Sequence, residues 1–233
     1  AQGFARNFFA GFATTCGLIQ SGRPCEENGR RFGLHGCVSN TPAHNVHVEQ
    51  SADGVTVTGI IDECHPEGEH MRLTRRLMLV GSRLEIHDHV QNLSDKETPF
   101  MMMYHMNFGA PFLSDKLRVE AAFLRTEDRD TGLSEAPERI LRMDNPSSMT
   151  SEKVYYTQPN MRQGVTLTDP ETEIICRLSF QGEGLDWMGV WKDFTADTYA
   201  LGIEPCNCPG LGRVGARERG ILPLLRPDES REH

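Results

Sequence analysis

Residues 99–108 read PFMMMYHMNF, a run of strand-forming apolar residues with two polar side chains near its end. Successive side chains of a β-strand point to opposite faces, so His105 and Asn107 share one face and the apolar residues between them take the other. A polar pair on so apolar a strand costs desolvation energy unless something binds it. The stretch therefore predicts a buried strand whose polar face needs a structural partner, a metal ion or a substrate.

Similar strand patterns continue on both sides of this run, and turn sequences such as ADG, NLSDKETP and TDPET separate them. Helical character is confined to one short stretch, 134–143, and no alternation of strands and helices suggests a doubly wound sheet. The sequence therefore predicts an all-β fold. Its predicted strands are 54–61, 71–80, 83–92, 99–108, 116–123, 152–158, 164–169, 172–180, 186–192 and 198–205.

Size and charge limit the classes of partner. A chain of 233 residues can bury the core of a single domain. Its 24 basic and 33 acidic residues give a net charge of −9, which argues against nucleic acid or an anionic membrane as the partner. No segment approaches the roughly 18 continuous apolar residues that a membrane-spanning helix needs. An uncharged sugar is compatible with this composition.

The first fifty residues differ from the rest of the chain. They are rich in glycine and turn formers, which predicts a long loop with little regular structure, and such loops are often functional. His35 lies there between glycines, in GLHG. The seven cysteines form no CxxC pair, so we expect inert thiols and a reducing, cytoplasmic location.

Three polar residues are candidates for chemistry: His35 in the glycine-rich loop, His105 on its strand, and Glu204 at the end of TYALGIEP. Ala200 and Gly202 share the strand face of Glu204, and their small size leaves room for a ligand there. Each candidate also has a structural interpretation, because a strand histidine can be a satisfied core residue and a glutamate before proline can be a solvated strand end.

Two further patterns leave alternatives open. Asp88 falls on the apolar face of its strand, with Leu84 and Val90, so it must find a bonding partner; we expect it to tie down a loop. Trp187 and Trp191 share a strand face, and they are either a platform for a sugar ring or core residues.

Three longer motifs, taken in order along the chain, are more specific than any single residue. They are AGFATTCGLIQSGRPCEENGRRFGLHGCVSNTPA, MMMYHMNFGAPFL and WKDFTADTYALGIEPCN. Together they resemble the aldose 1-epimerase-like family of the galactose mutarotase superfamily, and more narrowly its DUF4432-like branch. The resemblance implies a β-supersandwich with an open carbohydrate-binding cleft, formed by one domain over residues 1–233. The chain is shorter than is usual in the family, so we expect N-terminal strands to be absent from it.

The resemblance also implies roles for individual residues. His105 matches the general acid that protonates the sugar ring oxygen, and Glu204 matches the general base that takes the proton of the anomeric hydroxyl. His35 matches a substrate-contacting histidine, and Asn107 and Lys192 lie beside these motifs as further sugar contacts. The aspartate with which mutarotases grip sugar hydroxyls has no clear counterpart here. Cys37 stands where this branch leads us to expect a basic residue.

The predicted activity is isomerisation: interconversion of the anomers of a monosaccharide by acid–base ring opening, without a metal or another cofactor. Two alternatives remain open. His35, His105 and Glu204 have the composition of a two-histidine, one-carboxylate metal site, which would suit a metal-dependent isomerase or epimerase. The second alternative is a sugar-binding module that keeps the cleft but no longer catalyses a reaction. A homo-oligomer is compatible with an unpaired sheet edge.

Overall fold

The computed structural model describes residues 11–160, 164–181 and 184–233. The chain divides into two compact units. The first contains Cys16–Met102 and Gly210–His233, and the second contains Ala10–Thr15 and Met103–Pro209. The expectation that N-terminal strands are absent concerns the start of the chain, where residues 1–10 lie outside the described residues. That expectation, and that of one domain over 1–233, stay predictions.

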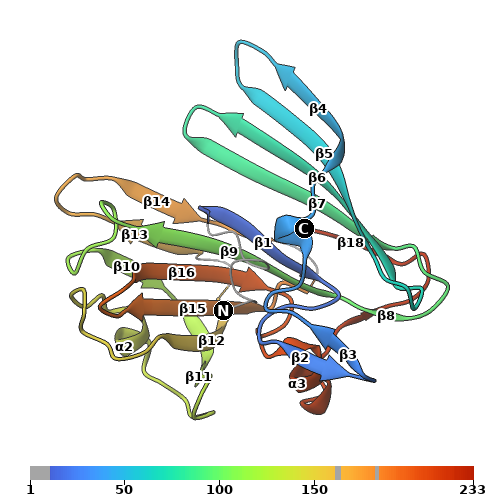
Figure 1. Ribbon diagram of the computed structural model, residues 1–233. Helices are drawn as coiled ribbons and strands as arrows, with labels where there is room; N and C mark the ends of the chain where they lie inside the picture. The colour runs from blue at the N-terminus through green and yellow to red at the C-terminus, as the bar shows by residue number, and fades with distance from the viewer. Residues whose placement is uncertain (1–10, 161–163, 182–183) are drawn as a thin grey trace. The chain divides into compact units, whose positions relative to one another are not determined.

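A six-stranded sheet dominates the second unit. Its strand order is β1-β9-β16-β15-β12-β11, and the strands from β9 to β11 run antiparallel. Figure 1 shows β9 beside β16, although about a hundred residues separate them along the chain. The bounds of these strands are Ala13–Leu18 (β1), Met101–Gly109 (β9), Tyr199–Cys206 (β16), Trp187–Phe194 (β15), Lys153–Pro159 (β12) and Phe123–Asp128 (β11).

One face of this sheet carries the core of the second unit. Alternation along β15 and β16 directs Met188, Val190, Leu201 and Ile203 to this face, and all four are buried. A three-stranded sheet and the short helix α2 contribute further core residues, including Leu167 and Ile140. Those elements are β10 (Arg118–Ala121), β13 (Val165–Thr168), β14 (Ile175–Leu178) and α2 (Pro137–Leu141). Because the core occupies one face, the opposite face of the six-stranded sheet holds the residues between these apolar positions.

The first unit is built on a five-stranded antiparallel sheet with the order β18-β7-β6-β5-β4. Its strands are β4 (His44–Gln50), β5 (Val55–Cys64), β6 (His70–Val80), β7 (Arg83–Asn92) and β18 (Ser230–Glu232). A two-stranded sheet pairs β8 (Thr98–Pro99) with β17 (Leu224–Leu225), and a hairpin pairs β2 (Cys25–Glu27) with β3 (Arg30–Phe32).

The all-β prediction is confirmed, and each of the ten predicted strands overlaps at least one observed strand. Two expectations were wrong. Residues 11–50 contain β1, the β2–β3 hairpin, a 3₁₀ turn at Val38–Asn40 and β4, so this part of the chain is not an irregular loop. A second described helix, α3 (Gly212–Glu218), forms although we expected helical character at 134–143 alone. Local sequence hides α3, because Gly212 and Gly215 weaken its helical pattern.

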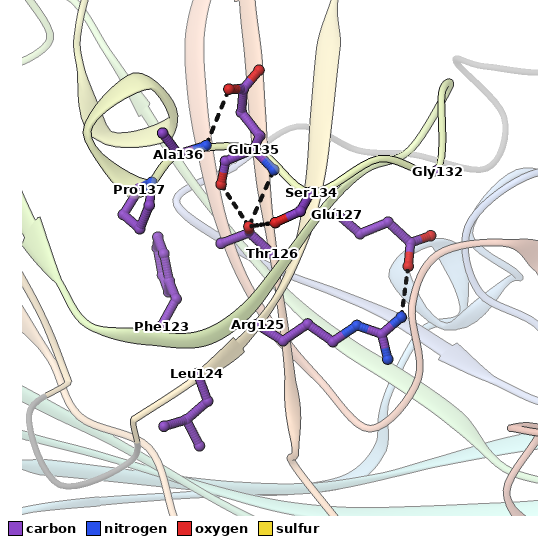
Figure 2. A pocket seen from close by; sticks show the side chains of 10 residues that line it. All are labelled: Phe123, Leu124, Arg125, Thr126, Glu127, Gly132, Ser134, Glu135, Ala136 and Pro137. Carbon is purple, nitrogen blue, oxygen red and sulfur yellow. Dashed lines mark hydrogen bonds and ion pairs between the residues drawn. The ribbon is translucent and has the colours of Figure 1, made fainter.

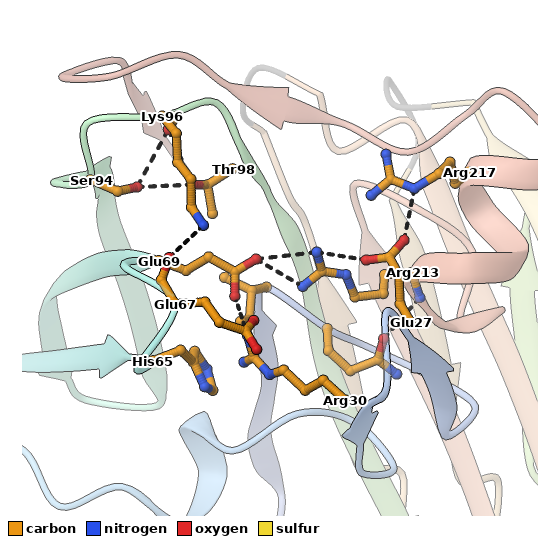
Figure 3. A network of polar contacts seen from close by, with 12 residues as sticks. Glu27, Arg30, His65, Glu67, Glu69, Ser94, Lys96, Thr98, Arg213 and Arg217 are labelled. Atoms are coloured by element: carbon orange, nitrogen blue, oxygen red, sulfur yellow. Dashed lines mark hydrogen bonds and ion pairs between the residues drawn. The ribbon is translucent and has the colours of Figure 1, made fainter.

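A network of ion pairs in the first unit explains why α3 forms (Figure 3). Arg213 of α3 is buried, and its guanidinium contacts Glu27 at 2.9 Å and Glu69 at 3.2 Å. Arg30 of β3 also pairs with Glu69. The guanidinium groups of Arg213 and Arg30 each lie 4.3 Å from the ring centre of Phe32. Tertiary contacts of these charged groups, rather than helix propensity, hold α3 in place.

Asp88, which we expected to tie down a loop, has one partner across the sheet. It is fully buried and lies opposite Arg75 in the register of β6 and β7. Arg75 donates two hydrogen bonds to its carboxylate, at 2.7 and 2.6 Å. The two-pronged pair compensates the desolvation of the buried charge, which is why a carboxylate can stand on an apolar strand face.

Within the described residues, no helix is both long enough and apolar enough to cross a lipid bilayer.

Candidate functional site

His105 and Glu204 meet on the face of the six-stranded sheet that is opposite the core. Pairs such as Ile203↔Met106 and Cys206↔Met103 fix the register of β16 and β9, and this register places Glu204 directly across from His105. The Nε2 atom of His105 lies 3.0 Å from an oxygen of Glu204. Both residues are nearly inaccessible to solvent, at 4% and 3% exposure. Two residues 99 positions apart thus form a buried acid–base contact.

Two glycines make the space in which the carboxylate of Glu204 lies. Gly189 on β15 stands opposite Glu204, and a Cβ atom there would come within 2.4 Å of Oε2. Gly202 lies two residues before Glu204, and a Cβ atom there would meet Oε1 at 2.6 Å and His105 Cε1 at 3.1 Å. The small residues that the sequence places around Glu204 therefore create room for its own carboxylate, where we had expected room for a ligand.

Burial changes the acidity of Glu204. Loss of solvent raises the pKa of its carboxyl group to about 8, and the negative charge of Glu152 adds to the rise. The positive charge of Arg129 opposes it. A carboxylic acid with such a pKa can accept or release a proton near neutral pH, which is the property that general acid–base catalysis requires.

Trp191 borders the pair. It lies opposite Gly202 in the register of β15 and β16, and its ring centre is 5.6 Å from that of His105 with the two planes 69° apart. It is half-buried, and its indole N–H donates a hydrogen bond to Glu152 at 2.8 Å. Of the two interpretations left open for this tryptophan, the structure favours a wall of the polar face over a core residue.

Asn107 lies on the same strand face as His105. Its side-chain amide donates hydrogen bonds to the backbone carbonyls of Gly11, at 2.7 Å, and His105, at 3.0 Å. Asn107 therefore fixes the chain beside the pair, and its contact with a sugar stays a prediction.

Lys192 lies on the other face of the sheet. Its amine donates hydrogen bonds to the carbonyls of Arg139 and Arg142, at 3.1 and 2.7 Å, and burial lowers its pKa to about 8. These contacts anchor α2 and the residue that follows it. The geometry gives no support to the predicted sugar contact, because the alternation along β15 separates Lys192 from the face of Glu204.

His35 belongs to the first unit. Its backbone has a positive φ of 59°, its N–H donates to the carbonyl of Gly22, and its carbonyl accepts from Gly17. The next residue, Gly36, has a φ of 74°, and a Cβ atom there would come within 2.5 Å of two backbone oxygens. Only glycine fits at position 36, so the glycine that follows His35 is a requirement of the loop's path. The substrate contact predicted for His35 stays a prediction.

Glu63 of β5 anchors the same loop. Its carboxylate accepts hydrogen bonds from the N–H groups of Leu18 and Ile19, at 2.5 and 3.2 Å, and contacts His65 at 3.0 Å. It also lies beside Cys37, where we expected a basic residue. Burial, reinforced by Glu63, raises the pKa of the Cys37 thiol to about 12. The thiol therefore stays protonated and unreactive at neutral pH.

The sequence analysis missed Glu152 and Arg129, which come from outside the quoted motifs. Alternation could have indicated Glu152, since it shares a strand face with Val154, the residue opposite Trp191. Nothing in the local sequence marks Arg129, which follows β11 and donates to Glu152 at 2.9 Å.

A separate hollow of about 620 Å³ opens beside β11 (Figure 2). Its polar groups bind one another: the Thr126 hydroxyl contacts the backbone of Glu135, and Arg125 pairs with Glu127 at 3.3 Å. None of the predicted site residues lines it, so we assign no chemistry to it. Elsewhere in the described ranges, no three histidine, cysteine, aspartate or glutamate side chains are grouped to hold a metal ion.

Solved structures resemble this chain in fold. A proposed aldose 1-epimerase from Klebsiella pneumoniae matches with a TM-score of 0.74 and 21% identity, over 96% of this chain and 62% of that one. The Slr1438 protein from Synechocystis sp. PCC 6803 matches at 0.73 and 19%, over 94% and 75%. A galactose mutarotase-like protein from Clostridium acetobutylicum matches at 0.67 and 17%, over 94% and 76%. The chain thus spans less than two thirds of the Klebsiella protein.

At these identities the likeness shows the fold, which is that of the galactose mutarotase-like proteins. No curated protein matches the sequence. The profile of a family described as Domain of unknown function (DUF4432) matches residues 1–233. The chain therefore belongs to the DUF4432 family and has a galactose mutarotase-like fold.

Proposed function

We propose that this protein is an aldose 1-epimerase-type isomerase that interconverts the anomers of a monosaccharide. The observation that carries the proposal is the buried contact between His105 and Glu204, 3.0 Å apart on the polar face of the sheet. The names of the structural relatives, a proposed aldose 1-epimerase and a galactose mutarotase-like protein among them, point to the same chemistry.

The proposed reaction needs one base and one acid. Ionised Glu204 takes the proton of the C1 hydroxyl while protonated His105 gives a proton to the ring oxygen, and the bond between C1 and the ring oxygen breaks. The open-chain sugar then rotates about its C1–C2 bond. Ring closure on the other carbonyl face reverses both transfers: Glu204 gives its proton to the former carbonyl oxygen, and His105 takes one from the hydroxyl that attacks it, so the pair is ready for another cycle. Each positioned proton transfer contributes about 10²–10⁴-fold to the rate.

The charges around the pair favour an uncharged sugar. Arg129 is bound to Asp130 and Glu152. Its guanidinium group is therefore already neutralised by carboxylates, and a phosphate or carboxylate on the substrate would have to compete with these contacts. Hydroxyl groups and an apolar ring face, for which Trp191 offers a wall, suit the site better.

The test is anomer-exchange NMR on the purified protein, with a panel of free aldoses and ketoses and a chelator present. We expect faster exchange for one class of sugar, which would also name the substrate class. No acceleration for any sugar would contradict the proposal. Recovery of isomerase activity on adding divalent metal ions would then favour the metal-dependent alternative, and saturable binding without exchange would favour a binding module.

The pH dependence of the reaction should reflect the burial of Glu204. A general base acts only when ionised, and the pKa of Glu204 is raised to about 8. The base form is therefore lost as the pH falls below that value, so kcat/KM should rise with pH through an inflection near it. Exchange rates measured from mildly acidic to alkaline pH check this. An inflection near 4.5, the ordinary glutamate value, would contradict the role of Glu204 as the base.

A further inference from the structure

Glu152 connects two side chains that lie on different strands. One oxygen of its carboxylate accepts a hydrogen bond from Nη1 of Arg129 at 2.9 Å, and the other accepts one from Nε1 of Trp191 at 2.8 Å. Arg129 directly follows β11, Glu152 directly precedes β12, and Trp191 is in the middle of β15. The carboxylate thus bridges the ends of two strands to the centre of a third.

The orientation of Trp191 matters because of what its ring touches. The indole lies 5.6 Å from the His105 ring and stands across from Gly202, which has no side chain to support it. Its neighbour on the other side is Val154. The hydrogen bond to Glu152 is therefore the polar contact that fixes the indole plane next to the proposed acid.

We propose that Glu152 is a positioning residue: it holds the Trp191 indole beside His105 as a wall of the sugar site, and with Arg129 it sets the charge balance at Glu204. This inference rests on the proposed function for its catalytic consequences. The position of the indole can be measured without any turnover.

The charge balance follows from the strand face that Glu152 shares with the pair. Val154, on the face of Glu152, lies opposite Trp191, and Trp191 lies opposite Gly202, two residues from Glu204. Groups that face Glu204 are His105 from β9, Glu152 before β12, Arg129 after β11, and Cys206 on its own strand. After desolvation, Glu152 is the largest cause that raises the pKa of Glu204, and Arg129 lowers it. Removing the charge of Glu152 removes a repulsion from Glu204 and leaves Arg129 paired with Asp130, so Glu204 should ionise at lower pH.

Two variants separate the hydrogen bond from the charge. Glu152→Gln removes the charge but keeps an oxygen that can accept from the indole N–H, and Glu152→Ala removes both. Glu171→Gln, in the exposed pair of Lys116 and Glu171, is the matched control for loss of one negative charge. All are made in a Trp187→Phe background, so that Trp191 is the single tryptophan and its fluorescence reports its surroundings.

For Glu152→Ala we expect Trp191 emission to shift to longer wavelength, stronger quenching by acrylamide, and a rise in KM of about two- to tenfold from the lost stacking wall. For Glu152→Gln we expect the Trp191 emission to stay close to that of the background protein. The acidic inflection in the pH profile of kcat/KM should move to lower pH in this variant, and Arg129→Gln should move the same inflection to higher pH.

Unchanged Trp191 fluorescence and unchanged KM in Glu152→Ala, as in the Glu171→Gln control, would overturn the positioning role. If the acidic side of the pH profile of kcat/KM is the same in Glu152→Gln as in the background protein, the electrostatic role of Glu152 is overturned. If the background protein itself accelerates no anomer exchange, the proposed function fails, while the fluorescence comparison still decides whether Glu152 positions Trp191.

Discussion

Glu204→Gln should reduce anomer exchange by about 10²–10⁴-fold, the contribution expected of one positioned base. Glutamine has nearly the same shape as glutamate, so it fits the space left by Gly189 and Gly202. It cannot take a proton from the sugar hydroxyl. The loss should therefore fall on kcat, which single-sugar exchange spectroscopy at saturating concentration measures directly.

His105→Asn should show a loss of similar size, because the acid acts in the same transition state as the base. Residues that act as a unit are not additive, so the double variant should be little worse than either single one. Saturation-transfer NMR should still detect sugar binding in each variant, which separates lost chemistry from lost binding. Retained turnover in both single variants would rule out the acid–base assignment.

The sequence was sufficient to predict most of the fold, because strand alternation is a local property. The face shared by Ala200, Gly202 and Glu204 could be read from β16 alone, and that shared by His105 and Asn107 from β9. The contact between His105 and Glu204 needed more than alternation. It depends on which strands are neighbours and in what register, and the sequence analysis had only the family resemblance to bring the two together.

The parts that the sequence did not indicate depend on distant contacts. α3 is held by the buried ion pairs of Arg213, and Asp88 is satisfied by Arg75 on the neighbouring strand. Glu152 acts through Trp191, 39 residues away. Lys192 illustrates the opposite case: its position beside a motif suggested a sugar contact, which stays a prediction, although strand alternation places it on the face opposite that of Trp191.

Gly189→Ala should reduce turnover by about 10²-fold or more while leaving the protein folded. The backbone of Gly189 does not have a positive φ, so alanine fits the strand. Its Cβ atom would lie 2.4 Å from Oε2 of Glu204, too close for any non-bonded contact, so the carboxylate must move. A shift of about 1 Å in a catalytic group can cost 10²-fold in rate.

This substitution adds one methyl group and removes no functional group, so it tests placement rather than chemistry. Gly59→Ala on β5 is the matched control, because a Cβ atom there meets its neighbours at ordinary contact distances of 3.4 Å or more. We expect Gly59→Ala to keep full turnover, and both variants to keep cooperative thermal unfolding by circular dichroism. If Gly189→Ala turned over sugar as fast as the control, the position of the Glu204 carboxylate would not limit the reaction, and its role as the base would have to be abandoned.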